Sequence, residues 1–322
     1  MKKFTLRLLW LTIIAALLYF ALHNAPLTEI WVSIRQLQLW QVALILSINA
    51  IFYLLATARW WIIVEAENKH VLFWPLFGVR VAVFGISYFT LGPQVGGEAL
   101  QVLVLRQKYH LSYTHATAAV LMDKLLEFLV DFFLIAVGLA AVLRAGVLTE
   151  SGIRLGLSLT VLVVLIAWPP IHLILLYKGR YPLTSLIHAI PFVRKTSRPV
   201  RFMRASEHLA SKFCQRHPRR LLTAFGISLL AGAGMLLDYA IMASFVNIHL
   251  PFWKTVAGWM SGWMSLLMPL PGGLGAFEAS QVFVLGKFGF SAATALSLTL
   301  LIRARDIFIG GLGVLLAGRG VK

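Results

Sequence analysis

The sequence predicts an all-α polytopic integral membrane protein, and three observations support this class. Of the 322 residues, 59% are hydrophobic and only 13% are charged, whereas soluble domains carry about 25% charged residues. The mean hydropathy is +0.83. The apolar residues gather in runs of about 20, the length that a helix needs to cross the hydrocarbon core. The single cysteine, Cys214, excludes an intrachain disulfide.

Eight stretches are long and apolar enough to predict transmembrane helices, at residues 4–22, 39–57, 71–90, 115–143, 155–177, 221–246, 252–268 and 291–317. For the first of them an uncleaved anchor is favoured over a cleaved signal peptide, because no convincing small-residue cleavage site follows it. Two further apolar segments, 97–105 and 276–287, follow Pro/Gly breaks and are too short to cross alone. They predict two re-entrant or broken helices, which a membrane tolerates where protein or a water-filled cavity satisfies the backbone.

Most of the net charge of +17 falls between residues 178 and 220, where eleven Lys and Arg residues face one acid, Glu207. In a membrane protein such a loop is expected on the cytoplasmic side, close to anionic lipids, so nucleic acid is not the expected partner. A cytoplasmic N-terminus followed by five spans would put this loop outside. Either the segment 97–105 contributes a crossing or one span is miscounted, so the number of crossings stays open. A multi-pass membrane protein is expected.

Two stretches of the chain repeat one pattern. "LGPQVGGEALQVLVL" (91–105) and "PLPGGLGAFEASQVFVL" (269–285) each break a span with Pro and Gly, place a glutamate, and continue as Gln-Val-x-Val-Leu. The expected break residues are Pro93, Gly96 and Gly97 in the first stretch and Pro271, Gly272, Gly273 and Gly275 in the second. The alternative is two unrelated helix breaks in a Gly-rich membrane protein.

The pattern continues downstream of each glutamate. Ser112 is followed by Lys124 and Glu127, and Ser291 by Arg303 and Asp306, at nearly the same spacing. Ser112 is placed to cap the next helix, and a basic and an acidic residue at i, i+3 lie on one helix face and can pair. These features predict one domain over 1–322 with two repeats, at about 39–143 and 221–317, on either side of the basic loop 178–220.

Ionisable residues within apolar segments are candidates for function. The predicted substrate-binding residues are Glu98, Glu278, Lys124, Glu127, Arg303, Arg305, Asp306 and Arg80. The alternative is an internal network of ion pairs that holds the bundle together. A metal, a cofactor and catalytic residues are not expected, because the closest histidines, His110 and His115, are poorly spaced for a metal and no phosphate-binding P-loop is present.

The paired Pro/Gly-to-Glu breaks, the C-terminal "PLPGGLGAFEA" and the following segment with Arg303 resemble the lysylphosphatidylglycerol synthase transmembrane-region (flippase-like, UPF0104) family. The resemblance covers roughly residues 4–317. It implies a multi-pass protein of the cell inner (cytoplasmic) membrane that moves, or helps to move, a polar lipid between leaflets. Full-length relatives with lysyl transferase activity carry a soluble aminoacyl transferase domain after the membrane part, and this sequence continues only to Lys322. Lysyl transfer is therefore not expected, and the lipid stays open.

Three functions follow as hypotheses. The first is a membrane lipid translocase that carries a polar or anionic head group through a groove between the two repeats. Glu98 and Glu278 would shape this groove, while Lys124, Arg303 and Arg305 hold the lipid phosphate. The second is a membrane scaffold whose basic loop docks a lipid-synthesis enzyme. The third is an integral-membrane head-group transferase or hydrolase, which is disfavoured because no nucleophile motif is present, so the protein is expected not to be an enzyme.

Overall fold

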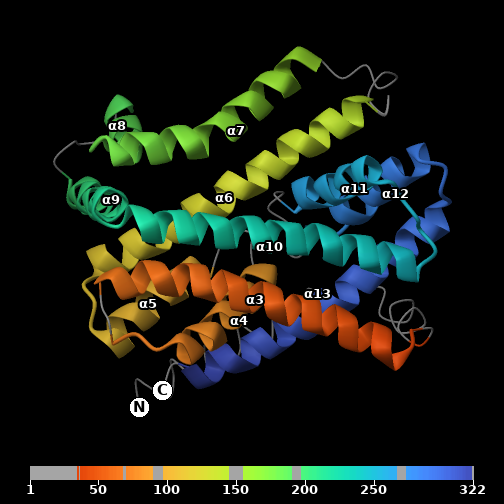
Figure 1. Ribbon diagram of the computed structural model, residues 1–322, viewed down its shortest axis with the longest axis horizontal. Helices are drawn as coiled ribbons and strands as arrows, with labels where there is room; N and C mark the ends of the chain where they lie inside the picture. The colour runs from red at the N-terminus through yellow and green to blue at the C-terminus, as the bar shows by residue number, and fades with distance from the viewer. Residues whose placement is uncertain are drawn as a thin grey trace. The chain divides into compact units, whose positions relative to one another are not determined.

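The computed structural model describes residues 35, 37–67, 70–89, 97–144, 155–190, 197–266 and 273–320 (Figure 1). Throughout these residues the regular structure is helical and no strand is present, which confirms the all-α class. The expected first span, 4–22, lies outside the described residues. The same holds for four of the expected break residues, which are Pro93, Gly96, Pro271 and Gly272.

The described helices follow one another with short connections. They are α3 (Leu39–Glu67), α4 (Phe73–Phe89), α5 (Glu98–Tyr109), α6 (Tyr113–Arg144), α7 (Leu155–Tyr177), α8 (Pro182–Ala189), α9 (Arg198–Arg216), α10 (Pro218–Phe245), α11 (Phe252–Ser265), α12 (Ala276–Lys287) and α13 (Ala292–Gly320). The two short helices expected after the Pro/Gly breaks are present as α5 and α12, with 12 residues each.

Within the described residues, three helical stretches are both long and apolar enough to cross a membrane, namely Leu39–Ala66, Tyr113–Val142 and Pro218–Phe245. The eight expected spans are therefore not confirmed as a set. The expected span 252–268 is helical only over the 14 residues of α11, about 21 Å of helix against a core of about 30 Å. Although α13 has 29 residues, any 18-residue window of it contains Arg303, Arg305 and Asp306.

The chain folds into two compact units, each assembled from separated stretches. Unit 1 takes its described residues from 35–50, 78–97 and 236–320, and unit 2 takes them from 51–77 and 98–235. Each unit has its own packing, which is described separately below.

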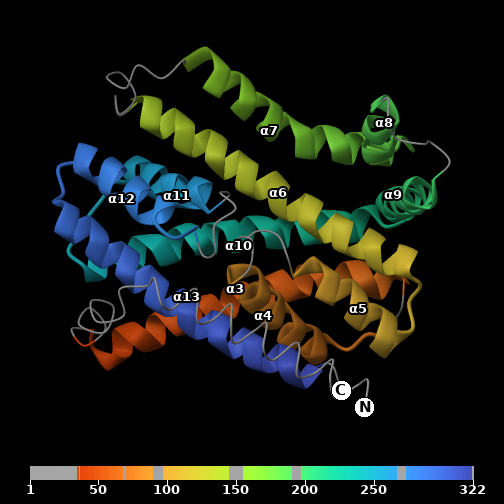
Figure 2. The same ribbon diagram turned by 180° about the vertical axis from the view of Figure 1, so that it is seen from behind.

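In unit 2 the long helix α6 is the central element, because α5, α7 and α9 all pack against it. Figures 1 and 2 show α6 and α7 side by side from both directions. The basic segment expected as a loop contains two helices, α8 and α9. Helix α9 buries Phe213 and Cys214 and leaves Arg201, Arg204 and Arg216 exposed. The positive charge of this segment therefore lies on the open face of a packed helix.

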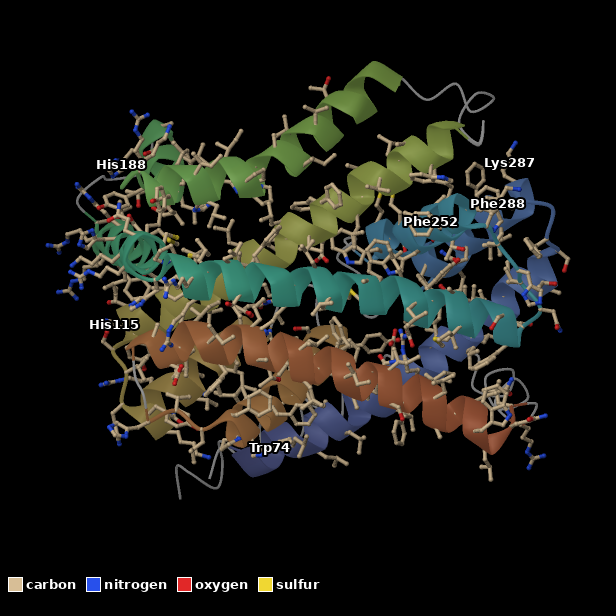
Figure 3. All side chains as sticks on the ribbon, viewed as in Figure 1. Trp74, His115, His188, Phe252, Lys287 and Phe288 are labelled. Carbon is tan, nitrogen blue, oxygen red and sulfur yellow. The ribbon has the colours of Figure 1, made fainter. Side chains whose placement is uncertain are left out.

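In unit 1 the helices α11 and α12 form an antiparallel pair, and α12 packs on α13. Figure 3 labels Phe252 at the start of α11 and Phe288 just after α12. The Nζ atom of Lys254 lies 5.2 Å from the centre of the Phe288 ring, so the start of α11 meets the end of α12. Helix α4 lies directly on α13, because a Cβ atom added at Gly313 would overlap the carbonyl oxygen of Val81.

Candidate functional site

The first charged cluster is built on α5 and α6 in unit 2. Glu98 is the first residue of α5, and its Oε1 lies 3.3 Å from Nζ of Lys124 on α6. The same ammonium group donates to Oε1 of Glu127 at 2.8 Å. The expected i, i+3 pair of Lys124 and Glu127 is thus confirmed, and a single lysine bridges the two glutamates. Ser112, which accepts a hydrogen bond from the backbone N–H of His115 at 3.2 Å, caps α6 as expected.

Arg59 of α3 joins this cluster from the other side of α6. Its Nε donates to Asp123 Oδ1 at 2.7 Å, and its Nη2 donates to Glu127 Oε2 at 2.6 Å. The Arg59 and Asp123 side chains are 4% and 0% exposed, so this pair is an internal brace. Arg59 was not among the predicted site residues, because the expected span ended at residue 57, whereas α3 continues to Glu67. We call Arg59, Glu98, Asp123, Lys124 and Glu127 the α5–α6 cluster.

The second cluster is centred on Arg303 of α13 in unit 1. Its Nε and Nη2 donate to the two carboxylate oxygens of Glu278 at 2.8 and 3.1 Å, a bidentate pair. Its Nη1 donates to the hydroxyl of Tyr88 at 3.2 Å, and its Nη2 also donates to the carbonyl of Gly273 at 3.2 Å. The Arg303 side chain is 4% exposed, while that of Glu278 is 22% exposed. The arginine is buried and its carboxylate is still reachable.

The glycines before α12 place Glu278 at this position. Gly273 and Gly275 adopt φ angles of 64° and 79°, a region that residues with a Cβ atom avoid. The backbone N–H of Gly275 donates to Oε2 of Glu278 at 2.8 Å, so the glutamate side chain satisfies this N–H group at the start of the helix. Ser291 caps the next helix, α13, by accepting from the N–H of Thr294 at 3.1 Å.

Gly97, the described break residue before α5, has a different reason to be glycine. Its N–H donates to the Ser87 hydroxyl at 2.9 Å. A Cβ atom at Gly97 would lie 2.5 Å from the carbonyl oxygen of Val83, so the chain here runs against the backbone of α4.

Arg305 and Asp306 extend the second cluster along α13. Arg305 bonds Asp238 of α10, and its Nη2 lies 2.8 Å from Asp306 Oδ1. Asp238 also accepts a hydrogen bond from Asn49 Nδ2 at 3.0 Å. Asp306 thus pairs with its neighbour Arg305, whereas Arg303, its expected partner at i, i+3, turns to Glu278. The α12–α13 cluster consists of Asp238, Glu278, Arg303, Arg305 and Asp306.

The structure therefore brings the predicted site residues into two separate sets. Glu98, Lys124 and Glu127 meet in unit 2, while Glu278, Arg303, Arg305 and Asp306 gather in unit 1. The remaining predicted residue, Arg80, is buried on α4 and belongs to neither cluster as defined. Tyr88, Asp238 and Asn49 enter the site from helices that lie far away in the sequence.

Each cluster holds two basic and three acidic side chains, so its carboxylates outnumber its cations when all are ionised. Lys124, Arg303 and Arg305, which were expected to hold a lipid phosphate, each contact a carboxylate. A phosphate would reach them only by taking the place of that carboxylate. Hydroxyl and amine groups suit the outward carboxylates of Glu98 and Glu278 directly.

Metal binding finds no support in the side chains described by the structure, where no group of three or more His, Cys, Asp or Glu residues could hold an ion. The contacts that the structure shows within both clusters are hydrogen bonds and ion pairs.

The apolar helices and the charged pairs between them define an integral membrane protein with polar side chains in its interior. The chain belongs to the family described as Lysylphosphatidylglycerol synthase TM region, which matches residues 7–313. A UPF0104 membrane protein of Pyrococcus horikoshii is 26% identical over 344 residues, which cover 98% of this chain and 97% of that protein. These two matches confirm the resemblance recognised in the sequence. No solved structure matches the chain.

Proposed function

We propose that this protein is a flippase-like lipid translocase of the cell inner membrane, which moves a polar or anionic lipid between the leaflets. One observation carries the proposal. Each of the two short helices carries in its first turn a glutamate that is ion-paired to a basic residue of the following long helix, Glu98 with Lys124 and Glu278 with Arg303. Charged pairs in apolar helices are costly, and they commonly mark the pathway of a polar substrate. Membership of the family supports the same reading.

The proposal includes an internal duplication, in which α3–α6 correspond to α10–α13. The paired helices have similar lengths, 29 and 28, 17 and 14, 12 and 12, and 32 and 29 residues. Adding 179 to the residue number takes Lys124 to Arg303, Glu127 to Asp306 and Arg59 to Asp238. Arg59 bonds acids on α6, and Asp238 bonds a base on α13. Both positions thus bond a charged residue of the last helix of their repeat, although Arg305 does not match Asp123 or Glu127 at this offset.

The short helices supply the polar surface that a head group needs. A helix of 12 residues is about 18 Å long and does not cross a core of about 30 Å, so α5 and α12 are proposed to be re-entrant. The Glu98 and Glu278 side chains are 23% and 22% exposed. Each carboxylate can exchange its basic partner for a hydroxyl or amine of the head group, and the released cation then meets the phosphate. The acyl tails stay in the lipid.

The translocase is proposed to act without chemical conversion of the lipid, so it is not an enzyme. Membrane lipids are its partners, with a lipid-synthesis enzyme as a further partner at the basic segment. The exposed arginines of α9 favour that second role, because a solvent-facing row of guanidinium groups suits an acidic surface. The groove between the two repeats, and the number of crossings, stay predictions from the sequence.

The proposal is tested by leaflet exchange in liposomes. The purified protein is reconstituted with a fluorescent phosphatidylglycerol, and the label on the outer leaflet is quenched chemically. Wild type is compared with Glu98→Gln and Glu278→Gln, alone and together. A matched control is Glu65→Gln, which removes a carboxylate that pairs with Arg220 at 2.8 Å, outside both clusters. Far-UV circular dichroism and gel filtration check that each variant is folded.

Exchange in the wild type that persists in Glu65→Gln and falls at least tenfold in the folded double variant is the expected result. Unchanged exchange in that double variant would remove the two clusters from the pathway. For the scaffold alternative, Arg201→Gln/Arg204→Gln is more informative than deletion of the basic segment, because α9 packs on α6 and α7. This variant should retain exchange and lose any bound enzyme if the basic face is a docking site.

A further inference from the structure

Two buried glutamines occupy matching positions in the short helices. Gln101 lies three residues after Glu98 on α5, and Gln281 lies three residues after Glu278 on α12. Both side chains are 0% exposed. A residue at i+3 shares a helix face with residue i, so each amide lies one turn further along the face that carries the glutamate.

The amide of Gln281 is fully used inside unit 1. Its Oε1 accepts a hydrogen bond from the Tyr239 hydroxyl at 2.7 Å. Its Nε2 donates to the carbonyl of Gly258 at 2.8 Å and to Ser261 Oγ at 3.1 Å. A Cβ atom added at Gly262 would lie 2.9 Å from this nitrogen. Gln281 is therefore a structural clamp between α10, α11 and α12, with no hydrogen-bonding capacity to offer a ligand.

Gln101 has the same burial and the opposite bonding state. Throughout the residues that the structure describes, neither its Oε1 nor its Nε2 has a hydrogen-bond partner. Buried amides are almost always bonded, because desolvation of an unsatisfied donor and acceptor is unfavourable. An amide held in this state beside the reachable Glu98–Lys124 pair points to a bonding partner that binds there.

The chemistry of the amide limits what this partner is. Gln101 needs an acceptor for its NH₂ group and a donor for its carbonyl oxygen. A phosphate oxygen only accepts, and an ammonium group only donates. A hydroxyl does both, and it can also donate to the Glu98 carboxylate. The carboxylates of the α5–α6 cluster outnumber its cations, so they disfavour a negatively charged phosphate as the direct partner of Gln101.

We propose that Gln101 and Glu98 form a binding site for the hydroxyl groups of a polyol-bearing lipid head group, and that Gln281 is the structural counterpart of Gln101, without ligand contacts of its own. The inference rests on the proposed lipid-handling function and assigns its head-group selectivity to the first copy alone. The two copies then divide their work. The glutamine of the first copy binds the hydroxyls, and the glutamine of the second copy holds α10, α11 and α12 together.

The test measures equilibrium binding, independently of transport. Purified protein in detergent micelles is titrated with phosphatidylglycerol, whose head group has two hydroxyls, and with phosphatidylethanol, which has the same phosphate and no hydroxyl. Native mass spectrometry counts the bound lipid, and a thermal melt follows stability. Wild type is compared with Gln101→Leu and with the matched control Gln281→Leu.

We expect the wild type to bind phosphatidylglycerol at least about fivefold more tightly than phosphatidylethanol, since one or two hydrogen bonds are at stake. In Gln101→Leu the ratio falls to about one, while the melting temperature is unchanged or higher, because no protein hydrogen bond is lost. Gln281→Leu melts earlier and, where folded, keeps the ratio. Equal affinities in wild type, or a preference that survives in Gln101→Leu, would overturn the inference. Hydroxyl preference without leaflet exchange would leave it standing and reject the translocase instead.

Discussion

The bidentate pair of Glu278 and Arg303 is predicted to contribute much more stability than the corresponding pair of Glu98 and Lys124. Glu278→Gln keeps one oxygen for Arg303 and replaces the other by an NH₂ group. This group then faces two donors, Arg303 Nη2 and the Gly275 N–H. Removing one partner of a buried ion pair costs about 3–5 kcal/mol. Since the Glu278 side chain is 22% exposed, we expect the lower end, about 3 kcal/mol.

The contrast with the first copy follows from its geometry. Oε1 of Glu98 lies 3.3 Å from Nζ of Lys124, and the lysine keeps Glu127 at 2.8 Å when Glu98 is neutralised. The side chains of Glu98 and Lys124 are 23% and 15% exposed. A loss of about 1 kcal/mol or less is therefore expected for Glu98→Gln.

Free energies of unfolding in mixed micelles, followed by tryptophan fluorescence as the fraction of denaturing detergent rises, measure both losses. A double-mutant cycle with Glu278→Gln and Arg303→Gln isolates the pair, and the coupling energy is expected to be about 2 kcal/mol. A coupling below about 0.5 kcal/mol, or equal losses for the two glutamates, would refute the argument from geometry.

Three further predictions concern packing, reactivity and capping. Gly313→Ala forces α13 away from α4 and is expected to lower the free energy of unfolding by about 1–3 kcal/mol. The control Gly311→Ala, whose added Cβ meets nothing within 4 Å, should be neutral or slightly stabilising in the same micelle assay. Equal effects of the two variants would contradict the close contact between α4 and α13. Burial raises the pKa of the Cys214 thiol to about 12, so the thiolate is scarce at pH 8. Labelling of Cys214 by a maleimide should therefore be at least about 100-fold slower in the folded protein than in the unfolded chain. Labelling at the unfolded rate would show that the thiol is accessible. Glu207 is fully buried and accepts hydrogen bonds from the backbone N–H groups of the first turn of α8 at 2.8 Å. Glu207→Ala should therefore release α8 and speed limited trypsin cleavage near it. An unchanged digestion pattern would show that these hydrogen bonds do not hold α8 in place.

Local features of the fold were readable from the sequence because their causes are local. The Pro/Gly breaks predicted the two short helices, and Ser112 predicted the cap of the helix that follows the first of them. Span boundaries were less accurate. The expected span stopped at residue 57, just before Arg59, whereas the apolar run resumes at Trp60 and α3 continues to Glu67.

The residues of the candidate site were likewise predictable only in part. Its glutamates and their basic neighbours downstream were recognised because intramembrane charges are rare and stand out in an apolar sequence. Their partners were not, since Tyr88 bonds Arg303 across 215 residues and Asn49 bonds Asp238 across 189. Such contacts depend on which helix faces meet.

The membrane class, the family, the short helices and the positions of the charges thus follow from composition and motif alone, because each depends on residues close together in the chain. Tertiary packing decided which charges pair, and it set apart two glutamines that look alike in sequence. Tyr239, Gly258 and Ser261 converge on Gln281, whereas in the described chain Gln101 meets no such group. A hydrogen bond needs its partner within about 3 Å and well aligned, and only the folded arrangement of distant helices supplies that partner or withholds it.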